Sequence, residues 1–400
     1  MVRLSACLIV KNEEILLPRC LGSIRSFVDE IIVVDTGSSD NTIEIARSYG
    51  SQVYNFEWVD DFSAARNESL RYATGDWILY IDADESVDES NADKIRRVIA
   101  RKDIMAVTVR QCIPQRSDNI ATAFYSEYCR IFLRHPGIRF EGIVHEQILP
   151  SIERLGGKVQ RTDIVINHWA YAITGEKKYR RAERNLKYLL KEKMRVPKDP
   201  FVHLNLGMTY RELGQNDSSM NAFHTAITLD DGQIKRELIG QVHLNLSKLY
   251  MERGDVSKAT YHAKQAAALA PANPLPVYLL ATLAVVGGNH KLAASHLEAV
   301  ISIAKGETGI PSEVEVDLSR AYLELGSCHS AVGDLLGAEQ DFVKSIEYSH
   351  TTALPYMLLG NCLFMRGDYT MAKVMFQRAL SLDPLLEGAQ QGLLLCRGSN

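Results

Sequence analysis

The sequence predicts two folds in one chain, an α/β domain with a mainly parallel sheet followed by an all-α domain of helical repeats. In residues 1–110, short apolar runs alternate with amphipathic segments, which is typical of βαβ units. Beyond residue 200 the pattern is helical throughout, and it repeats. The length of 400 residues fits this division, because one domain holds roughly 150 residues.

Composition narrows the class of protein. The net charge of −4 provides no basic field for nucleic acid. The 7 cysteines are odd in number, scattered and without a C-x-x-C pair, which argues against a disulfide framework or structural zinc site and favours a cytoplasmic location. The first apolar run, Leu4–Val10, is too short to span a membrane and lacks the features of a signal peptide, so we interpret it as a buried strand, and no later run is long enough to cross a membrane.

The elements of the first half follow in order along the chain. Strands are predicted at Leu4–Val10, Ile31–Val34, Gln52–Tyr54, Trp77–Ile81 and Ile104–Val109. Helices are predicted near 14–26, 42–49, 62–73 and 91–101. Further strands are expected at 128–133 and 160–166, and a charged helix at 175–193. We expect a first domain at 1–172, a linker helix within 173–199 and a repeat domain at 200–396.

The second half repeats around a glycine, found at 214, 254, 287 or 288, 333 and 367. The most complete copy contains Leu359-Gly360, Gly367, Ala372, Phe376 and Pro384. This pattern resembles the tetratricopeptide repeat, a helix-turn-helix unit of about 34 residues. It predicts about five helical hairpins, with an unrelated helical bundle as the alternative.

A pair of acids follows the apolar run Trp77–Ile81. Ligands bind at the carboxyl ends of parallel strands, and Asp82 and Asp84, two residues apart in extended chain, point the same way. Two carboxylates there suit a hard divalent cation that also takes phosphate oxygens. The alternative is that the two acids only solvate the strand end and cap the next helix.

Polar residues also follow the first two strands. Asp35 ends the second strand, and Asn12 and Glu13 follow the first. If the sheet is parallel, these side chains share one edge with Asp82 and Asp84, and an acid there can accept hydrogen bonds from a ribose or a base. The sequence therefore favours a nucleotide cleft, although Asn and Asp also serve as helix N-caps.

Four segments carry a family resemblance: Ser5–Glu14, Val34–Thr42, Asp61–Asn67 and Tyr80–Glu85. Together they resemble family-2 glycosyltransferases of the GT-A fold, in the subgroup of lipopolysaccharide-core glucosyltransferases and sublancin-type peptide glycosyltransferases. The resemblance covers residues 1 to about 172. One departure is that Thr36 follows Asp35, where many members have a second acid.

The resemblance implies a role for each matching position. The nucleobase and ribose would be bordered by Val10, Asn12, Glu13 and Asp35, with Arg66 facing the same cleft. Asp82 and Ala83 would adjoin the donor, Asp82 would approach the ribose or the metal, and Asp84 would be the principal ligand of Mn²⁺ or Mg²⁺.

Two later segments complete the predicted site. Phe140–Glu146 resembles the G-x-V-H-E segment of the subgroup, and Ile166–Tyr171 resembles its closing His-aromatic segment. An inverting transfer needs a base for the acceptor proton and positive charge at the departing diphosphate. Glu146 is the predicted base, with His145 as its orienting partner or itself the base, and His168 is a predicted metal or phosphate contact or else a buried core histidine.

These features predict an inverting glycosyltransferase that moves a sugar from a nucleotide-diphosphate donor, expected to be UDP-linked. Repeat superhelices offer a concave surface to extended partners, which favours a peptide or protein acceptor. A homodimer through the repeats, a lipopolysaccharide or other glycan acceptor, and an inactive first domain on a protein-binding scaffold are the alternatives.

Overall fold

A computed structural model of the chain describes residues 2–114, 121–169, 175–232, 234–308, 312 and 314–398. The chain forms two compact units. Unit 1 comprises Met1–Gln115 and Phe124–Leu229, and unit 2 comprises Arg116–Ala123 and Asp230–Asn400. The predicted boundary at residue 172 lies outside the described residues.

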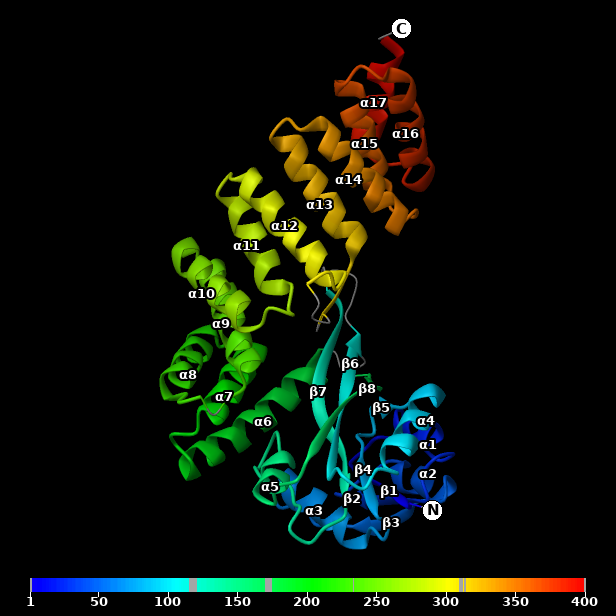
Figure 1. Cartoon of the computed structure of the whole chain (residues 1–400), viewed down its shortest axis with the longest axis vertical. Coiled ribbons are helices and arrows are strands. Elements are labelled where there is room, and N and C mark those ends of the chain that lie inside the picture. The colour runs from blue at the N-terminus through cyan, green and yellow to red at the C-terminus, as the bar shows by residue number, and fades with distance from the viewer. Residues whose placement is uncertain are drawn as a thin grey trace. The chain divides into compact units, whose positions relative to one another are not determined.

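Unit 1 is built on a mixed sheet, with the strand order β3-β2-β1-β4-β7-β6-β8-β5 (Figure 1). The strands are β1 Leu4–Val10, β2 Glu30–Asp35, β3 Gln52–Asn55, β4 Trp77–Tyr80, β5 Glu85–Ser86, β6 Ala106–Pro114, β7 Ala121–Leu133 and β8 Val159–His168. Strands β1 to β4 pair in parallel, as expected. The mainly parallel sheet becomes mixed because β7 lies antiparallel to β4 and β5 lies antiparallel to β8.

Four helices lie close to the expected positions: α1 Leu17–Ile24, α2 Thr42–Ser48, α3 Phe62–Tyr72 and α4 Glu89–Val98. A fifth helix, α5 Leu149–Arg154, was not predicted. Helix α1 buries Leu17, Cys20, Leu21 and Ile24, the spacing of one helical face. Asp61 caps α3, because its carboxylate accepts the N–H of Ala64 at 3.1 Å.

Three more helices belong to unit 1: α6 Glu176–Arg195, α7 Pro200–Glu212 and α8 Asn216–Leu229. Helix α7 starts at Pro200, and the side chain of Asp199 before it accepts the N–H of Phe201 at 2.8 Å. Helices α7 and α8 form the first antiparallel pair of the repeats. This pair belongs to the same compact unit as the sheet.

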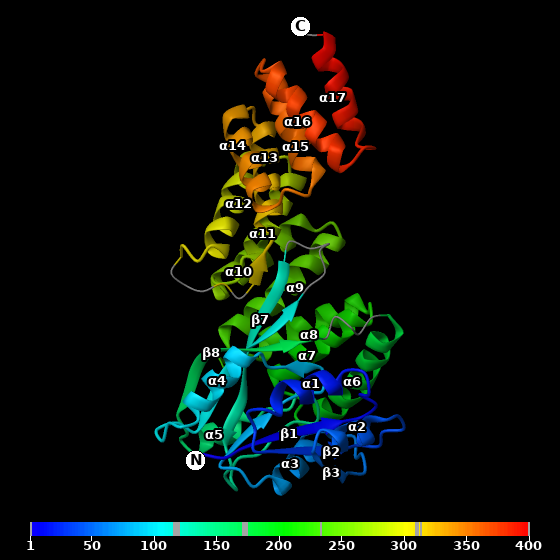
Figure 2. The same ribbon diagram turned by 90° about the vertical axis from the view of Figure 1, so that its right-hand side faces the viewer.

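Unit 2 continues as a stack of antiparallel helix pairs (Figure 2). Its elements are α9 Arg236–Glu252, α10 Val256–Leu269, α11 Leu275–Val286, α12 His290–Ala304, β9 Val314–Val316, α13 Leu318–Ala331, α14 Leu335–Tyr348, α15 Ala353–Met365, α16 Tyr369–Leu382 and α17 Glu387–Gly398.

The predicted repeat glycines lie in the turns within the helix pairs, and they have positive φ at 214, 254, 288, 333 and 367. Of the two candidates in the third copy, Gly288 is therefore the turn residue. Other glycines allow close packing, since a Cβ on Gly360 would lie 2.7 Å from the ring of Phe376. These contacts explain why small and aromatic residues alternate in the repeat.

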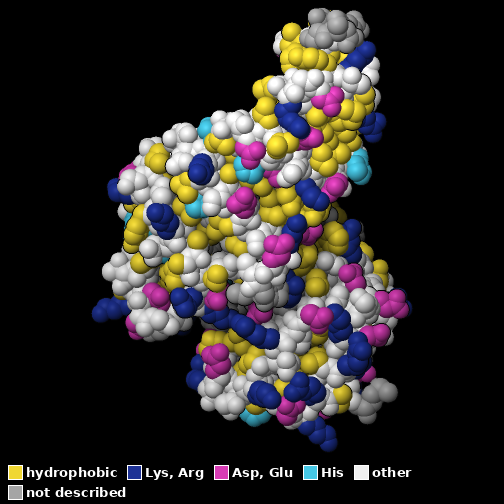
Figure 3. All heavy atoms as spheres, turned by 45° about the horizontal axis from the view of Figure 1, so that its top comes forward, with side chains coloured by type: hydrophobic (Ala, Val, Ile, Leu, Met, Phe, Trp, Pro, Cys, Tyr) yellow, Lys and Arg dark blue, Asp and Glu magenta, His cyan; other side chains and the backbone are white. Residues whose placement is uncertain are grey.

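The surface carries mixed charge. On the face drawn in Figure 3, lysine and arginine side chains are interspersed with aspartate and glutamate. Among the described residues, no helix is both long and apolar enough to cross a membrane.

Candidate functional site

The centre of the site is the chain that follows β4. All four residues of β4 are buried in the sheet, and Asp82-Ala83-Asp84 leaves its carboxyl end. The next residues form the short strand β5, which pairs with the end of β8 so that Glu85 lies opposite His168. This pairing brings His168 of the His-aromatic segment to Asp82 and Asp84, which lie 86 and 84 residues earlier in the sequence. Ala170 and Tyr171 of that segment lie outside the described residues.

Asp82 is held by two arginines. Arg66 Nη2 donates to Asp82 Oδ1 at 2.5 Å, and Arg130 Nη2 donates to Asp82 Oδ2 at 3.1 Å. Burial raises the pKa of Asp82, but the two guanidinium groups more than offset this and hold it well below its usual range. Asp82 is therefore an ionised carboxylate whose two oxygens already have partners.

Asp84 faces His168. The Nε2 atom of His168 lies 3.4 Å from Asp84 Oδ2, and its Nδ1 is buried with no hydrogen-bond partner among the described residues. Burial lowers the pKa of His168, against the charge of Asp84, which favours the neutral imidazole that metals bind. Burial and then the charge of Asp82 raise the pKa of Asp84.

A buried network lies behind Asp82, and sequence reasoning did not predict it. Arg130 Nη2 donates to Glu85 Oε1 at 2.6 Å, and Gln111 donates to the same oxygen. Burial raises the pKa of Glu85 to about 7, against the opposing charge of Arg130. The sequence signal is Arg130 within the otherwise uncharged run 128–133, because a buried arginine needs a buried anion.

The ends of β1 and β2 meet as predicted from a parallel sheet, with Val10 opposite Asp35. Asn12 has a positive φ of 56°, and its side-chain oxygen accepts the N–H of Ser39 at 2.8 Å. Asp35 is 4 % exposed, and its carboxylate accepts the N–H groups of Gly37 and Ser38, both at 3.0 Å. Both side chains thus fix the loops at this edge.

The other predicted residues at this edge of the sheet take part mainly through their backbone atoms. The N–H of Glu13 donates to Thr42 Oγ1 at 2.7 Å, and the side chains of Val10 and Ala83 are buried. Thr36 donates its hydroxyl to the Val10 carbonyl at 3.0 Å.

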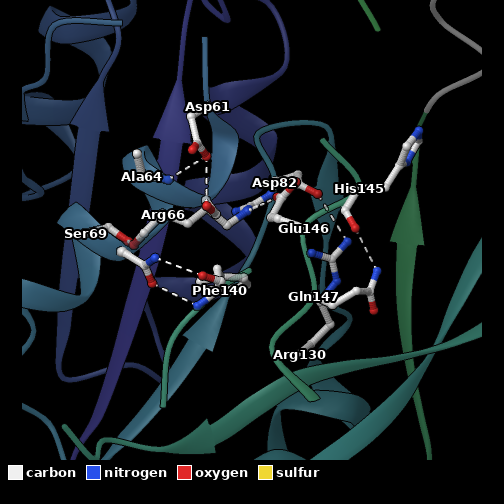
Figure 4. A network of polar contacts seen from close by, with 12 residues as sticks. Asp61, Ala64, Arg66, Ser69, Asp82, Arg130, Phe140, His145, Glu146 and Gln147 are labelled. Atoms are coloured by element: carbon white, nitrogen blue, oxygen red, sulfur yellow. Dashed lines mark hydrogen bonds and ion pairs between the residues drawn. The ribbon is translucent and has the colours of Figure 1, made fainter. Parts of the chain in front are cut away.

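Glu146 lies on a short closed loop. Glu141 and Gln147 exchange backbone hydrogen bonds of 3.0 and 2.8 Å, which close residues 141–147 into what we name the Glu146 loop. Arg66 Nε donates to Glu146 Oε1 at 2.5 Å, so Arg66 bridges Glu146 and Asp82 (Figure 4). His145 has a positive φ of 56°, is exposed, and points its imidazole away from Glu146 in Figure 4.

The residues present fit a divalent cation. Around the end of β4, the four carboxyl groups of Asp82, Asp84, Glu85 and Glu146 outnumber the two guanidinium groups. No group of three or more metal-ligating side chains occurs among the described residues. Asp84 and neutral His168 would therefore hold the ion with help from substrate phosphates, which is common for Mg²⁺ and Mn²⁺.

Comparison with known proteins supports this division of the chain. The profile of the family described as Glycosyl transferase family 2 matches residues 5–141, and profiles of the tetratricopeptide repeat match residues 202–232 and 353–386. Glu146 and His168 lie beyond the first match.

Two relatives match the chain over different lengths. A TPR repeat-containing protein of Synechococcus elongatus is 31% identical over 68% of this chain and 76% of its own length. The SPbeta prophage-derived glycosyltransferase SunS of Bacillus subtilis is 33% identical over 35% of this chain and 33% of its own. Among solved structures, the TPR protein YrrB is similar over 51% of this chain and 96% of its own, with 16% identity and a TM-score of 0.43.

Proposed function

Because the chain belongs to glycosyltransferase family 2 and carries tetratricopeptide repeats, we propose that it is an inverting, metal-dependent transferase. It moves a sugar from a nucleotide-diphosphate donor, a UDP-hexose or UDP-N-acetylhexosamine, onto a side chain of a peptide or protein. The observation that carries this proposal is the convergence of Asp84 and His168 with the Arg66-bridged pair of Asp82 and Glu146.

The donor lies along the edge formed by the ends of β1, β2 and β4. The Asn12 and Asp35 loops border the nucleoside, and Asp84 with His168 would hold the divalent cation. When bound, the cation offsets the negative charge that develops on the leaving diphosphate. Asp82, whose oxygens already bond to Arg66 and Arg130, orients the donor side of the cleft.

Glu146 removes the acceptor proton as the nucleophile attacks the anomeric carbon. Its bond to Arg66 holds the side chain toward the end of β4. His145 is the weaker candidate for the base because its imidazole is exposed and points away from Glu146. It contributes instead through its backbone, which turns the chain at positive φ.

The acceptor is proposed to be a polypeptide because the repeats supply a surface for extended chains. A glycan acceptor uses the same donor chemistry and remains an outcome of the test. An inactive domain on a scaffold is disfavoured, since Asp84, His168, Arg66 and Glu146 would have no reason to converge.

The test is a panel of UDP-, GDP- and TDP-sugars with Mn²⁺ or Mg²⁺, offered with peptide and glycan acceptors and read by mass shift. We expect one UDP-sugar to be transferred to a peptide. Glu146→Gln should abolish transfer while UDP still binds, because it removes the base and leaves the donor edge intact. Transfer at the wild-type rate in that variant would place the base elsewhere.

A further inference from the structure

Helix α6 contacts the two loops that position Arg66 and Glu146. One is the Glu146 loop. The other is residues 58–61, which lead into α3 and therefore into Arg66. The start of α3 also bonds to the Glu146 loop, since Phe62 N–H donates to the Ile143 carbonyl at 2.9 Å.

The contact to the Glu146 loop comes from one carboxylate. Glu192 Oε1 accepts the N–H of Ile143 at 3.2 Å, and the N–H of Val144 also bonds to this side chain. Gly142 turns the chain at a φ of 98°, where a Cβ would lie 3.5 Å from Glu192 Oε1. The loop thus presents two consecutive backbone amides to α6, and Glu192 satisfies both.

We propose that Glu192 is a positioning residue for transfer, which holds the Glu146 loop so that Glu146 faces the acceptor. This inference rests on the proposed function. The side chains of Ile143 and Val144 are buried, so their amides have little access to water if the carboxylate is removed. Leaving a buried N–H without an acceptor is unfavourable, and the loop would move to satisfy these two amides.

A second contact fixes the other loop. Asp60 has a positive φ of 59°, and its Oδ1 accepts the Trp58 indole N–H at 3.1 Å and the Tyr188 hydroxyl at 3.0 Å. Its Oδ2 accepts Lys187 at 3.1 Å and Lys191 at 2.9 Å. One face of α6 therefore anchors the start of α3, while Glu192 anchors the Glu146 loop, so both ends of the Arg66–Glu146 ion pair depend on the same helix.

The same contact region joins the site to the first helix pair of the repeats. Ile143, Val144 and Tyr188 belong to one buried cluster. The other buried members are Leu189, Val202, Leu206 and Ala222, from α6, α7 and α8. The first helix pair therefore acts as part of the transferase unit, and its packing reaches the loop of the proposed base.

The test compares three full-length variants. Glu192→Ala removes both acceptors, Glu192→Gln keeps one carbonyl oxygen, and Glu183→Ala is the matched control because Glu183 is an exposed glutamate on the same helix. The readouts are UDP release from the active donor of the panel, with kcat and KM separated, and amide hydrogen exchange of a peptide covering residues 140–148.

We expect Glu192→Ala to lower kcat by about 10- to 100-fold, because misplacing a reacting group by about 1 Å can cost up to about 100-fold. KM for the donor should stay within about twofold, since the donor edge is untouched. Exchange should quicken in peptide 140–148 but not along α6. Glu192→Gln should recover part of kcat, and Glu183→Ala should match the wild type.

An unchanged kcat in Glu192→Ala, or unchanged exchange of the Glu146 loop, overturns the positioning role while leaving the proposed function standing. If Glu192→Ala does not fold, Glu192→Gln decides, and a wild-type kcat and exchange pattern there overturns the proposal. A wild-type chain that turns over no donor overturns the proposed function, and the exchange measurement still decides whether Glu192 fixes the loop.

Discussion

Replacing Arg130 by methionine should destabilise unit 1 strongly. Arg130 is 5 % exposed, donates to Glu85 at 2.6 Å and to Asp82 at 3.1 Å, and lies 4.4 Å over the Tyr80 ring. Each charge-assisted hydrogen bond contributes about 1.5–3 kcal/mol, and the ring contact adds up to about 2 kcal/mol. Protonation of Glu85 limits the loss, so we expect a decrease of about 3–5 kcal/mol in the free energy of unfolding.

The loss should depend on pH. The pKa of Glu85 is already raised to about 7, and without Arg130 it rises further. Between the pKa of an unfolded glutamate, about 4.3, and this raised value, the folded state binds the extra proton, so stability falls as pH rises. The decrease caused by Arg130→Met should therefore be larger at pH 8.5 than at pH 5.5.

The assay is urea unfolding in EDTA, followed by tryptophan fluorescence. The 3 tryptophans, Trp58, Trp77 and Trp169, all lie in unit 1, so the signal reports this unit alone. The control is Arg161→Met, which removes an exposed ion pair with Glu127 and should cost less than about 1 kcal/mol. Adding Glu85→Gln to Arg130→Met should restore stability at pH 8.5. Equal losses for Arg130→Met and Arg161→Met would refute the reasoning.

Two further predictions concern α6 and the first helix pair. Asp60→Asn should lower stability at neutral pH, because hydrogen bonds from Lys191 and then Lys187 hold the pKa of Asp60 well below its usual range. That stability is present above the unfolded pKa of about 3.9 and is lost as pH falls below it. Wild type and variant should therefore converge in acid in urea unfolding followed by tryptophan fluorescence, and a constant difference contradicts this. Gly207→Ala would place a Cβ 2.4 Å from the Phe223 ring and should cost about 1–3 kcal/mol in urea unfolding. The control Gly22→Ala, whose nearest atom is 3.8 Å away, should be neutral or stabilising, and equal effects of the two changes would contradict the packing argument.

Much of the fold was predictable because strands and helices have periodic patterns. The runs at Leu4–Val10 and Trp77–Ile81 correspond to β1 and β4, and the repeat glycines correspond to turns with positive φ. The direction of β7 was not predictable, because periodicity identifies a strand but not the neighbour with which it pairs. The mixed sheet follows from that pairing.

The residues of the candidate site were likewise predictable only in part. Asp84 and Asp35 follow strands with clear patterns, so their shared edge followed from parallel pairing. Glu192 had no sequence signal, since a glutamate in a charged helix is usually solvated, and only tertiary packing brings it to Ile143. Asp82 illustrates a related limit, because the arginines that occupy its oxygens come from α3 and β7, far away in the chain.

The most direct test of the account is Mn²⁺-dependent release of UDP from the active sugar donor, measured for the wild type and for Asp84→Asn. The account predicts that the wild type turns over only with a divalent cation, and that Asp84→Asn folds normally but loses turnover together with Mn²⁺ binding in the presence of UDP. Wild-type turnover by Asp84→Asn, or turnover by the wild type in EDTA, would contradict it.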